Sequence, residues 1–392
     1  MSISNRFQFL DVFRGMDVAL MIIVNAMASA QDYDMKGHAL TTASNAEPQS
    51  GPFDAIWTPL QHAEWDGFTL ADFVFPTFLF VVGCSMFFSL TRYQGMPDSA
   101  VLRKVAKRTA IIFLIGYLMY WFPFFHFNAA GELIFRPFGE TRMLGVLQRI
   151  ALCYGIAAMV IHFWKARGAV IYSIVAVLSY PVILLLFGDL TMEGNIGTWI
   201  DRAILGESHM YHGEGFAFDP EGILSTMPSV VNVLAGYLAA SLISRKGSGY
   251  ETIARMMVVG ALLLLAAQWV NLLLPINKKL WSSSYVLHTI GLDLLALPVV
   301  MYIIEVAGIR KWTPFFEVFG KNTLFIYLLA EVMVILMYWY PTAEGSLYQT
   351  IHSAIFRPAG EHLGSLLFGL WVMMTCWTVG WILDKKGIYI KV

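Results

Sequence analysis

Ten long apolar segments decide what this chain can fold into. A helix needs about 20 mostly apolar residues to cross a lipid bilayer. Segments near that length lie near residues 12–29, 69–90, 109–127, 143–163, 169–188, 223–243, 254–274, 284–305, 318–340 and 361–383. Only 14% of the 392 residues are charged, against about 25% in a soluble domain. The sequence therefore predicts an all-α, polytopic transmembrane helix bundle of about ten spans, in a single domain over residues 1–392.

Lysine and arginine residues set the expected orientation of the bundle. With the N-terminus in the cytoplasm, 18 of the 26 basic residues fall in cytoplasmic segments and 7 in extracytoplasmic ones, with Arg149 inside a span. This agrees with the concentration of basic residues on the cytoplasmic side of membrane proteins. Ten spans then place both termini in the cytoplasm. Two long loops, near 30–67 and 189–222, are expected outside, and loops of that length usually carry function.

Several functional classes are not supported by the sequence. The net charge of −1 gives no reason to expect a nucleic-acid partner. The motifs GxSxG, GxxxxGK[ST], HExxH and CxxC are absent. Cys84, Cys153 and Cys376 all fall in predicted spans, so we expect small core residues rather than disulfides. His209 and His212 have a spacing that suits a metal, but a third clear ligand is missing, and no metal is predicted.

The segment QHAEWDGFTLADFVFPTFLF, residues 61–80, is the most informative part of the chain. Titratable groups at the mouth of an apolar helix are costly to keep there and usually mark a site. His62 can take up and release a proton near neutral pH, which suits proton or acyl transfer. The alternative is that His62 and Trp65 anchor the chain among the lipid headgroups.

Polar residues also interrupt the predicted spans. They are Asp17, Asn25, Arg149, His288, Asp293 and Glu331. Intramembrane charges face a bundle interior or a watery cavity, so the chain is expected to enclose something polar. For Arg149 considered by itself, the alternative to a functional role is a buried ion pair with Glu331 or Asp293. Asp11 and Arg14 are three residues apart on one helix face, so we expect them to pair.

Six motifs together resemble one family. They are RFQFLDVFRG at 6–15, VNAMAS around Asn25, QHAEWDG followed by ADFVFPTFLF, GVLQRI around Arg149, FDPEGIL from Phe218, and PINKKLWSSSYVLH from Pro275. This series resembles the heparan-α-glucosaminide N-acetyltransferase family, which comprises lysosomal transmembrane enzymes with bacterial relatives. The matches run in family order from residue 6 to about 330 and so cover most of the chain.

The resemblance implies an acetyl-CoA-dependent N-acetyltransferase. An acetyl group from cytosolic acetyl-CoA would pass to the amine of a glucosamine-type sugar on the extracytoplasmic side. The family's large lumenal N-terminal domain has no counterpart here, and Asp66 replaces an asparagine of the human member. We therefore expect a small amino-sugar acceptor rather than heparan, and an integral protein of a bacterial inner membrane, in contact with the lipid bilayer. The sequence leaves open whether it forms homo-oligomers.

The resemblance also suggests roles for individual residues. The family's active histidine falls on His62 and its partner asparagine on Asn25, and Asp72 is included as a third catalytic candidate. The candidates for binding acetyl-CoA are Arg149, Asn277, Lys278, Ser282, Ser284 and, from the basic loop 92–108, Arg92. The candidates for binding the acceptor are Trp65, Asp66, Asp219, Glu221 and Trp281. The basic residues of the loop 92–108 could instead serve only to set the orientation of the protein in the membrane.

The chemistry of the residues fits this reading without deciding the route. Attack on a thioester needs a base to deprotonate the amine, and donors to the oxyanion, which Asn25 with Ser282 or Ser284 could supply. His62 could instead carry the acetyl group between two half-reactions. An amino-sugar transporter is the alternative of another class, because a polar cavity in a helical bundle suits both. A non-catalytic scaffold would leave His62 and Arg149 without a role.

Overall fold

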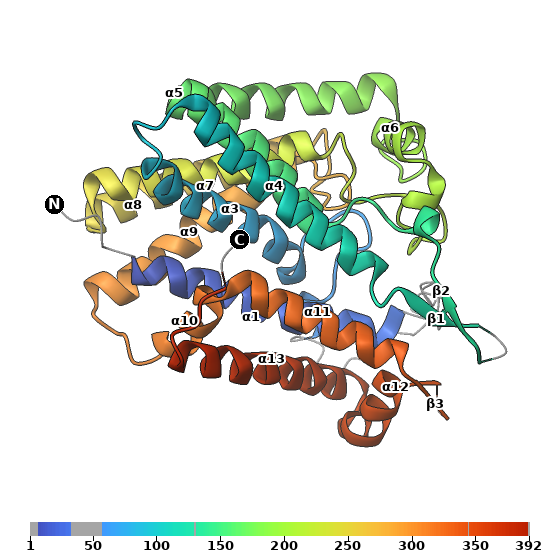
Figure 1. The fold of residues 1–392 in the computed structure, drawn as a ribbon. Helices are drawn as coiled ribbons and strands as arrows, with labels where there is room; N and C mark the ends of the chain where they lie inside the picture. Colours follow the sequence, from blue (N-terminus) through green and yellow to red (C-terminus); the bar gives the residue numbers. More distant parts are fainter. Residues whose placement is uncertain (1–6, 33–56, 129–130, 344, 391–392) are drawn as a thin grey trace.

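The computed structural model describes residues 7–32, 57–128, 131–343 and 345–390, and most of these residues are helical (Figure 1). The long helices are α1 (Gln8–Asp32), α3 (Leu70–Thr91), α4 (Asp98–Trp121), α5 (Val146–Phe187), α7 (Thr226–Lys246), α8 (Tyr250–Asn271), α9 (Ser283–Met301), α11 (Thr323–Trp339) and α13 (Glu361–Lys385). The shorter ones are α6 (Ile196–Leu205), α10 (Thr313–Lys321) and α12 (Leu347–Ile351). Short 3-10 or π turns include η2 (Thr58–Leu60), η4 (Glu207–His209) and η5 (Tyr302–Val306). Two small antiparallel hairpins pair β1 (Phe125–Phe127) with β2 (Leu133–Phe135), and β3 (Pro341–Thr342) with β4 (Gly345–Ser346).

The helices coincide with the predicted apolar segments, and this confirms an all-α bundle. The 42-residue helix α5 covers two of the predicted spans. A straight helix of that length would measure about 63 Å, twice the hydrocarbon core. Its helical geometry is broken at Lys165, with φ 55° and ψ −151°, and its two halves run back along each other (Figure 1). The turn thus lies where the sequence places the boundary between the two spans.

The apolar segment predicted at 318–340 is divided by a sharp bend. This segment belongs to two helices, α10 and α11, which are bent by 83° at the residue between them. That residue, Asn322, is buried, and its side chain binds the backbone of the C-terminal segment. Its Nδ2 donates to the Ile388 carbonyl at 3.0 Å and its Oδ1 accepts from the Ile390 N–H at 2.9 Å. The sequence does not indicate this bend, because an apolar segment has the same hydropathy whether its helix is straight or bent.

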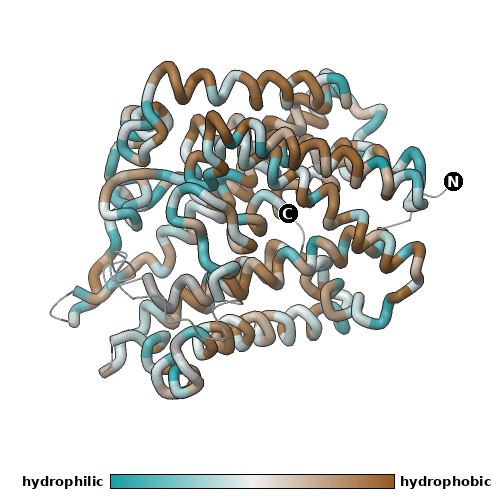
Figure 2. The backbone as a smooth tube through the Cα atoms, turned by 180° about the vertical axis from the view of Figure 1, so that it is seen from behind, coloured by the Kyte–Doolittle hydropathy of each residue, from teal (hydrophilic) through white to brown (hydrophobic). Residues whose placement is uncertain are grey.

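Fewer helices than expected meet a strict test for crossing a membrane. Six helices in the described parts of the chain are long and apolar enough, or seven if the bent pair α10–α11 counts as one span. Helix α4 carries Arg103, Lys104, Lys107 and Arg108 in its first half, and α1 carries Asp11, Arg14 and Asp17. Apolar residues follow the helices, and hydrophilic residues gather toward the helix ends and the connections (Figure 2). The total of ten spans and the cytoplasmic termini therefore stay predictions.

Helix α3 lies at the centre of the bundle and packs most closely against α7. The two backbones meet at Gly83 and Gly236. A Cβ atom on Gly83 would lie 1.9 Å from the Val233 carbonyl oxygen, and one on Gly236 would lie 1.8 Å from the Phe80 oxygen. Only glycine allows this approach, a common device where membrane helices pack. The contact fixes α3, whose first turn carries part of the candidate site described below.

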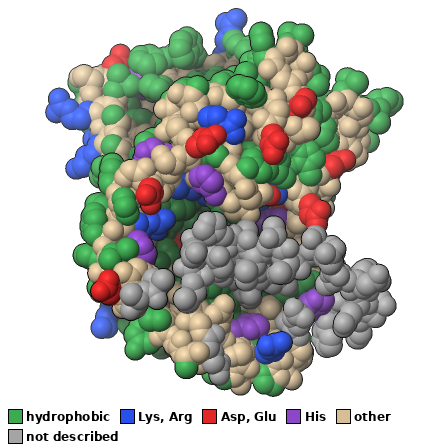
Figure 3. Space-filling view, turned by 90° about the vertical axis from the view of Figure 1, so that its right-hand side faces the viewer, with side chains coloured by type: hydrophobic (Ala, Val, Ile, Leu, Met, Phe, Trp, Pro, Cys, Tyr) green, Lys and Arg blue, Asp and Glu red, His purple; other side chains and the backbone are tan. Residues whose placement is uncertain are grey.

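The long connections gather at one end of the bundle, on the right in Figure 1. The β1–β2 hairpin, α6 and α12 lie at this end, whereas the short turn between α3 and α4 lies at the other. Figure 3 views the loop end directly and shows acidic, basic and histidine side chains around a hollow. The predicted extracytoplasmic loop 189–222 lies here, as does the described part of the first loop, 57–67, whereas residues 33–56 lie outside the described residues. We call this end the loop end.

Candidate active site at the loop end

Asp72 occupies the third position of α3 and is fully buried. Its Oδ2 atom accepts hydrogen bonds from the Ala63 N–H at 3.1 Å and the Thr69 N–H at 3.2 Å. Such a carboxylate satisfies backbone donors at a helix N-terminus and is favoured by the helix dipole. The Tyr285 hydroxyl donates to the Asp72 carbonyl at 2.6 Å and so ties this turn to α9. These bonds hold the carboxylate in place and leave its Oδ1 atom for a further partner.

That further partner is His62. The Nδ1 atom of His62 lies 2.8 Å from Oδ1 of Asp72. A carboxylate in this position accepts the Nδ1 hydrogen of a neutral imidazole, so that Nε2 keeps its lone pair. The His62 side chain is 40% exposed, whereas that of Asp72 is 1% exposed. The arrangement is a buried carboxylate that orients an accessible base, and it places two catalytic candidates together.

Lys278 completes this group from a different part of the chain. Its Nζ atom lies 3.0 Å from Nδ1 and 3.2 Å from Nε2 of His62, and 3.6 Å from Oδ1 of Asp72. The group of His62, Asp72 and Lys278 is called the histidine cluster below. It joins residues 216 positions apart in the sequence, so only the packing of α3 against α9 and its preceding loop can form it.

The loop 275–282 holds Lys278 in place through its own polar side chains. The Asn277 Oδ1 atom accepts from the Leu280 N–H at 2.8 Å, and the Ser282 Oγ atom accepts from the Asn277 N–H at 3.1 Å. Ser282 and Ser284 both donate to the Pro275 carbonyl, at 2.7 and 2.8 Å. All three polar side chains are fully buried. The structure therefore gives the serines a part in shaping the loop that presents Lys278.

The electrostatics of the histidine cluster favour a neutral base. Burial lowers the pKa of His62 below 6.5, the nearby Lys278 ammonium lowers it further, and the hydrogen bond with Asp72 opposes both. Burial likewise lowers the pKa of Lys278, although the Asp72 carboxylate opposes this shift. His62 is therefore unprotonated at neutral pH and ready to accept a proton.

A second charged group lies nearby and was missed by sequence reasoning. Arg142 binds Asp219 at 2.7 Å and Glu221 at 2.6 Å, and its guanidinium lies over the rings of Tyr120 and Tyr211. The two acidic residues were predicted to bind the acceptor, and the structure pairs both with this arginine. The sequence by itself gives Arg142 no role beyond that of an extracytoplasmic basic residue. The acidic motif FDPEG was a weak sign that a buried cation would be needed.

The two charged groups are neighbours. Glu221 is close enough to Lys278 to influence its ionisation, and Trp65 packs edge-on against Phe218, with ring centroids 6.3 Å apart. Trp65 is half-buried, and Asp66 beside it is exposed. Of the predicted acceptor-binding residues, Trp65 and Asp66 therefore lie three and four residues after His62, and Asp219 and Glu221 follow Phe218, which Trp65 contacts.

Trp281, the fifth of these residues, is buried with only 1% of its surface exposed. Its backbone adopts a left-handed φ of 52°, a costly conformation that persists only under strong constraint. The constraints are visible: Nε1 donates to Asn232 at 3.3 Å, and the rings of Phe75 and Tyr285 pack against its edge. The buried indole therefore helps to hold the loop 275–282 in its conformation.

Arg149 lies against the other side of this indole, with its guanidinium 4.9 Å from the ring centroid. It is completely buried and donates to the Ser229 hydroxyl and the Gly222 carbonyl, each at 3.0 Å, and to the Ser225 hydroxyl. The carboxylate partners that sequence analysis allowed are elsewhere, since Glu331 binds Asn25 and Asp293 binds Thr77. We call Arg149 and its three partners the arginine cluster.

The remaining catalytic candidate, Asn25, lies on α1. Its Nδ2 atom donates to Glu331 on α11 at 2.8 Å. The structure therefore ties Asn25 on α1 to α11. The described contacts of His62 are instead with Asp72 and Lys278.

Arg92 is separated from every other candidate. It is exposed and follows the last residue of α3, at the opposite end of the helix from Asp72. The 22 residues of α3 span roughly 33 Å. The structure therefore does not bring Arg92 to the histidine cluster.

Metal chemistry finds no support in the residues that the structure describes, where no group of three histidine, cysteine or acidic side chains could hold an ion. His209 and His212 both face backbone carbonyls, Thr141 at 2.7 Å and Met210 at 3.0 Å. Cys84, Cys153 and Cys376 are buried and free, as predicted.

Comparison with known proteins finds two mammalian relatives. The chain is 26% identical to heparan-alpha-glucosaminide N-acetyltransferase of Mus musculus over 451 aligned positions, which cover all of this chain and 61% of the relative. It is 26% identical to the protein of that name from Homo sapiens over 386 positions, which cover 83% of this chain and 53% of the relative. The chain thus spans between about half and three fifths of their length. No family model matches. These values support a distant resemblance over most of the chain.

Proposed function

We propose that this chain, a distant relative of the heparan-alpha-glucosaminide N-acetyltransferases, is a transmembrane acyltransferase that moves an acetyl group from acetyl-CoA to the amine of a glucosamine-type sugar. The observation that carries this proposal is the pairing of His62 with Asp72 at 2.8 Å. A buried carboxylate that orients an accessible, neutral imidazole is the arrangement that acyl transfer uses for its base. The resemblance does not favour the alternative of a transporter.

In the direct route, His62 takes the proton of the acceptor amine through Nε2 while Asp72 holds Nδ1. The amine nitrogen forms a bond to the thioester carbon, the carbon–sulfur bond breaks, and the thiolate takes the proton back from His62. Lys278 supplies the positive charge nearest to the oxyanion that forms on the way. In this role it takes the place proposed for Ser282 and Ser284, whose hydroxyls already bind the Pro275 carbonyl.

Two orphaned side-chain donors fit a bound acetyl donor or acceptor at the histidine cluster. Nε2 of Gln61 and Nδ2 of Asn277 are buried and lack hydrogen-bond partners within the described part of the chain. Gln61 precedes His62, and Asn277 precedes Lys278, so both lie next to the reacting groups. Buried donors of this kind normally find a partner, and a substrate carbonyl or hydroxyl would supply one. Asn277 thus remains a candidate for binding acetyl-CoA, and Gln61 joins it.

The double-displacement route remains the rival within the same activity. If Nε2 of His62 attacked the thioester itself, CoA would be released before the acceptor arrives. Purified protein mixed with acetyl-CoA alone would then release CoA in amounts matching the enzyme. Release only after addition of glucosamine would support direct transfer. Mass spectrometry of candidate amino sugars in the same mixture tests the activity as a whole, and a lack of any acetylated sugar would refute it.

The sidedness of the reaction is part of the proposal. The charge bias places Arg92 in the cytoplasm and the histidine cluster outside, and α3 separates them by roughly 33 Å. The pantetheine arm spans about half of a core near 30 Å, so the nucleotide would lie within the bundle and pass Arg92 only on entry. In sealed vesicles of known orientation, acetyl-CoA should act only from the cytoplasmic side. A requirement for both substrates on one side would refute this sidedness and leave the acetyltransferase standing.

A further inference from the structure

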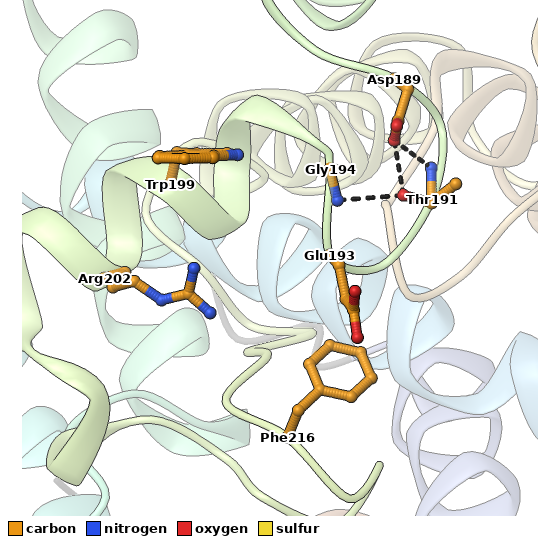
Figure 4. Close-up of a pocket in the computed structure, with 7 residues that line it drawn as sticks. All are labelled: Asp189, Thr191, Glu193, Gly194, Trp199, Arg202 and Phe216. Carbon is orange, nitrogen blue, oxygen red and sulfur yellow. Dashed lines mark hydrogen bonds between the residues drawn. The ribbon is translucent and has the colours of Figure 1, made fainter.

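A separate pocket of about 550 Å³ opens beside α6, away from the histidine cluster. Figure 4 shows its lining residues, which come from the turn 189–194, from α6 and from the segment around Phe216. The volume lies within the usual range for small-molecule sites. None of its lining residues belongs to the histidine cluster or to the residues proposed to bind acetyl-CoA or the acceptor. The pocket is therefore distinct from the proposed reacting site.

The rim of the pocket is a rigid turn. The Asp189 carboxylate accepts from the N–H and the hydroxyl of Thr191, and these bonds hold its pKa below the usual range. The buried Asn195 side chain donates to the carbonyls of Thr191 and Met192, both at 2.8 Å, and caps α6 by accepting from the Thr198 N–H. The turn is therefore preformed, as binding pockets usually are.

The lining combines aromatic surface with negative charge. Trp199 is 57% exposed on α6 and contributes its indole to the pocket lining. Phe216 faces the pocket beside Glu193 (Figure 4). Two carboxylates, Asp189 and Glu193, outnumber the single cation Arg202, which is paired with Glu207 at 2.7 Å. Such a site suits a ligand with an apolar face and a positive charge.

An aromatic row leads from this pocket to the histidine cluster. Phe216 lies 6.5 Å from Phe218, and Phe218 lies 6.3 Å from Trp65, measured between ring centroids. Trp65 is three residues from His62 in the chain. The lining of the pocket and the segment that carries His62 are therefore joined by two ring-to-ring contacts, and we expect an acceptor of more than one sugar unit to reach both.

We propose that this pocket, the α6 pocket, binds a second amino-sugar unit of an oligosaccharide acceptor while the terminal unit reacts at His62. A hexosamine presents an apolar ring face to Trp199 and an ammonium group to Glu193. This inference rests on the proposed function, because it assigns a binding site to the acceptor of that reaction. An exposed tryptophan at this level could instead serve as an anchor at the membrane surface, and the experiment separates the two roles.

The test uses the full chain in lipid nanodiscs with glucosamine and its β-linked trimer as acceptors. Trp199→Ala should raise KM for the trimer at least about tenfold, as expected for loss of a central aromatic contact, and leave kcat unchanged. KM for glucosamine should stay within about twofold, since the monosaccharide uses only the reacting site. Glu193→Gln should also raise KM for the trimer, because it removes the negative charge and keeps the size of the side chain. Ile204→Ala, 65% exposed on the same helix and outside the pocket lining, is the matched control.

Direct binding of the trimer, measured by calorimetry without acetyl-CoA, keeps this inference separate from the proposed activity. If no saccharide is acetylated but the trimer binds and Trp199→Ala abolishes binding, the pocket stands and the proposed function fails. If the trimer is acetylated with equal KM by wild type and both pocket variants, the pocket is refuted and the function stands. Equal loss in Trp199→Ala and Ile204→Ala would also refute it, because that result indicates membrane anchoring.

Discussion

The histidine cluster and the arginine cluster lie at the same end of the bundle, and each is built around a basic residue from a recognisable motif. They differ in the exposure of the basic residue to solvent and in whether charged side chains lie next to it. His62 is 40% exposed and has both a carboxylate and an ammonium group as neighbours. Arg149 is sealed, and its hydrogen bonds go to two hydroxyls and a carbonyl. The first arrangement can exchange a proton with a substrate, whereas the second can only hold protein segments together.

The comparison shows that a motif match can identify an important residue without establishing its role. Arg149 was expected to bind the phosphates of CoA or to pair with an acid. It instead joins the start of α5 to the start of α7 and supports Trp281, which underlies the loop that carries Lys278. Its effect on catalysis would therefore run through the position of that loop. The following experiments test whether the two clusters are as different as their surroundings indicate.

The largest effect is expected at His62. His62→Ala removes the proposed base, so turnover should fall by about 10²–10⁴-fold, the range for loss of a general acid–base group. Folding should be preserved, because the side chain is partly exposed and supports little of the core. Acetyl transfer and thermal unfolding would both be measured on the purified variant. His126→Ala, exposed on the hairpin at the same end of the bundle, is the matched control and should change neither quantity.

Arg149→Met should affect stability rather than chemistry. The variant loses three hydrogen bonds from a charged group and leaves buried oxygen atoms without their donor, which we expect to cost roughly 2–4 kcal/mol. Unfolding followed in detergent with increasing denaturant would measure this change. Arg255→Met removes a surface arginine paired with Glu251 at 2.8 Å and should cost less than about 1 kcal/mol. A stable Arg149→Met protein that loses its affinity for acetyl-CoA would return Arg149 to the binding site.

Lys278→Met should change the pH dependence of the reaction as well as its rate. Removal of the ammonium group raises the pKa of His62, since Lys278 is one of the two main causes that lower it. The acid limb of the kcat/KM profile, where His62 becomes protonated, should therefore move to higher pH. Turnover at neutral pH should fall about 10²–10³-fold through loss of oxyanion stabilisation.

The adjacent Lys279 provides a graded control for this prediction. It is paired with Glu214 at 2.7 Å and lowers the pKa of His62 more weakly than Lys278 does. Lys279→Met should therefore shift the acid limb in the same direction by a smaller amount. Identical profiles for wild type and Lys278→Met would show that the two side chains are not coupled in solution.

The smallest effect is expected at Asp201, near the arginine cluster. Burial raises the pKa of this carboxyl to about 7, although the hydrogen bond from the Ile223 N–H opposes the shift. A raised pKa means that the folded protein holds a proton that the unfolded chain releases near pH 4. The contribution of Asp201 to the free energy of unfolding is therefore largest below about pH 4, declines as pH rises toward 7, and levels off above it.

Asp201→Asn keeps the acceptor oxygen and removes this dependence. The variant should unfold at a higher temperature than wild type at pH 8 and at nearly the same temperature at pH 4. Glu64→Gln, an exposed substitution at the same end of the molecule, should shift both temperatures equally or not at all. A gain that is the same at both pH values would contradict the proposed protonation of Asp201.

Much of the fold could be predicted because hydropathy acts locally. Each apolar segment is helical over most of its length, and even the turn inside α5 lies at the expected residues near Lys165. The bend at Asn322 could not be predicted, because its cause is the binding of that amide to the backbone near Ile388 and Ile390, more than 60 residues away. The pairing of Asp11 with Arg14 at 3.3 Å was predicted, since three residues of helix bring such side chains together.

The sequence by itself determined the helical membrane class, the resemblance to an acetyltransferase family, and the candidacy of His62, because these follow from composition and from residues close together in the chain. Only the tertiary structure decided which candidates meet. It joined His62 to Asp72 and Lys278, enclosed Arg149 and Trp281, tied Ser282 and Ser284 into a loop, and gave Asp219 and Glu221 a partner in Arg142. The physical reason is that burial and charge compensation depend on neighbours from distant helices, and a pattern along one segment carries no information about which helix will lie beside it.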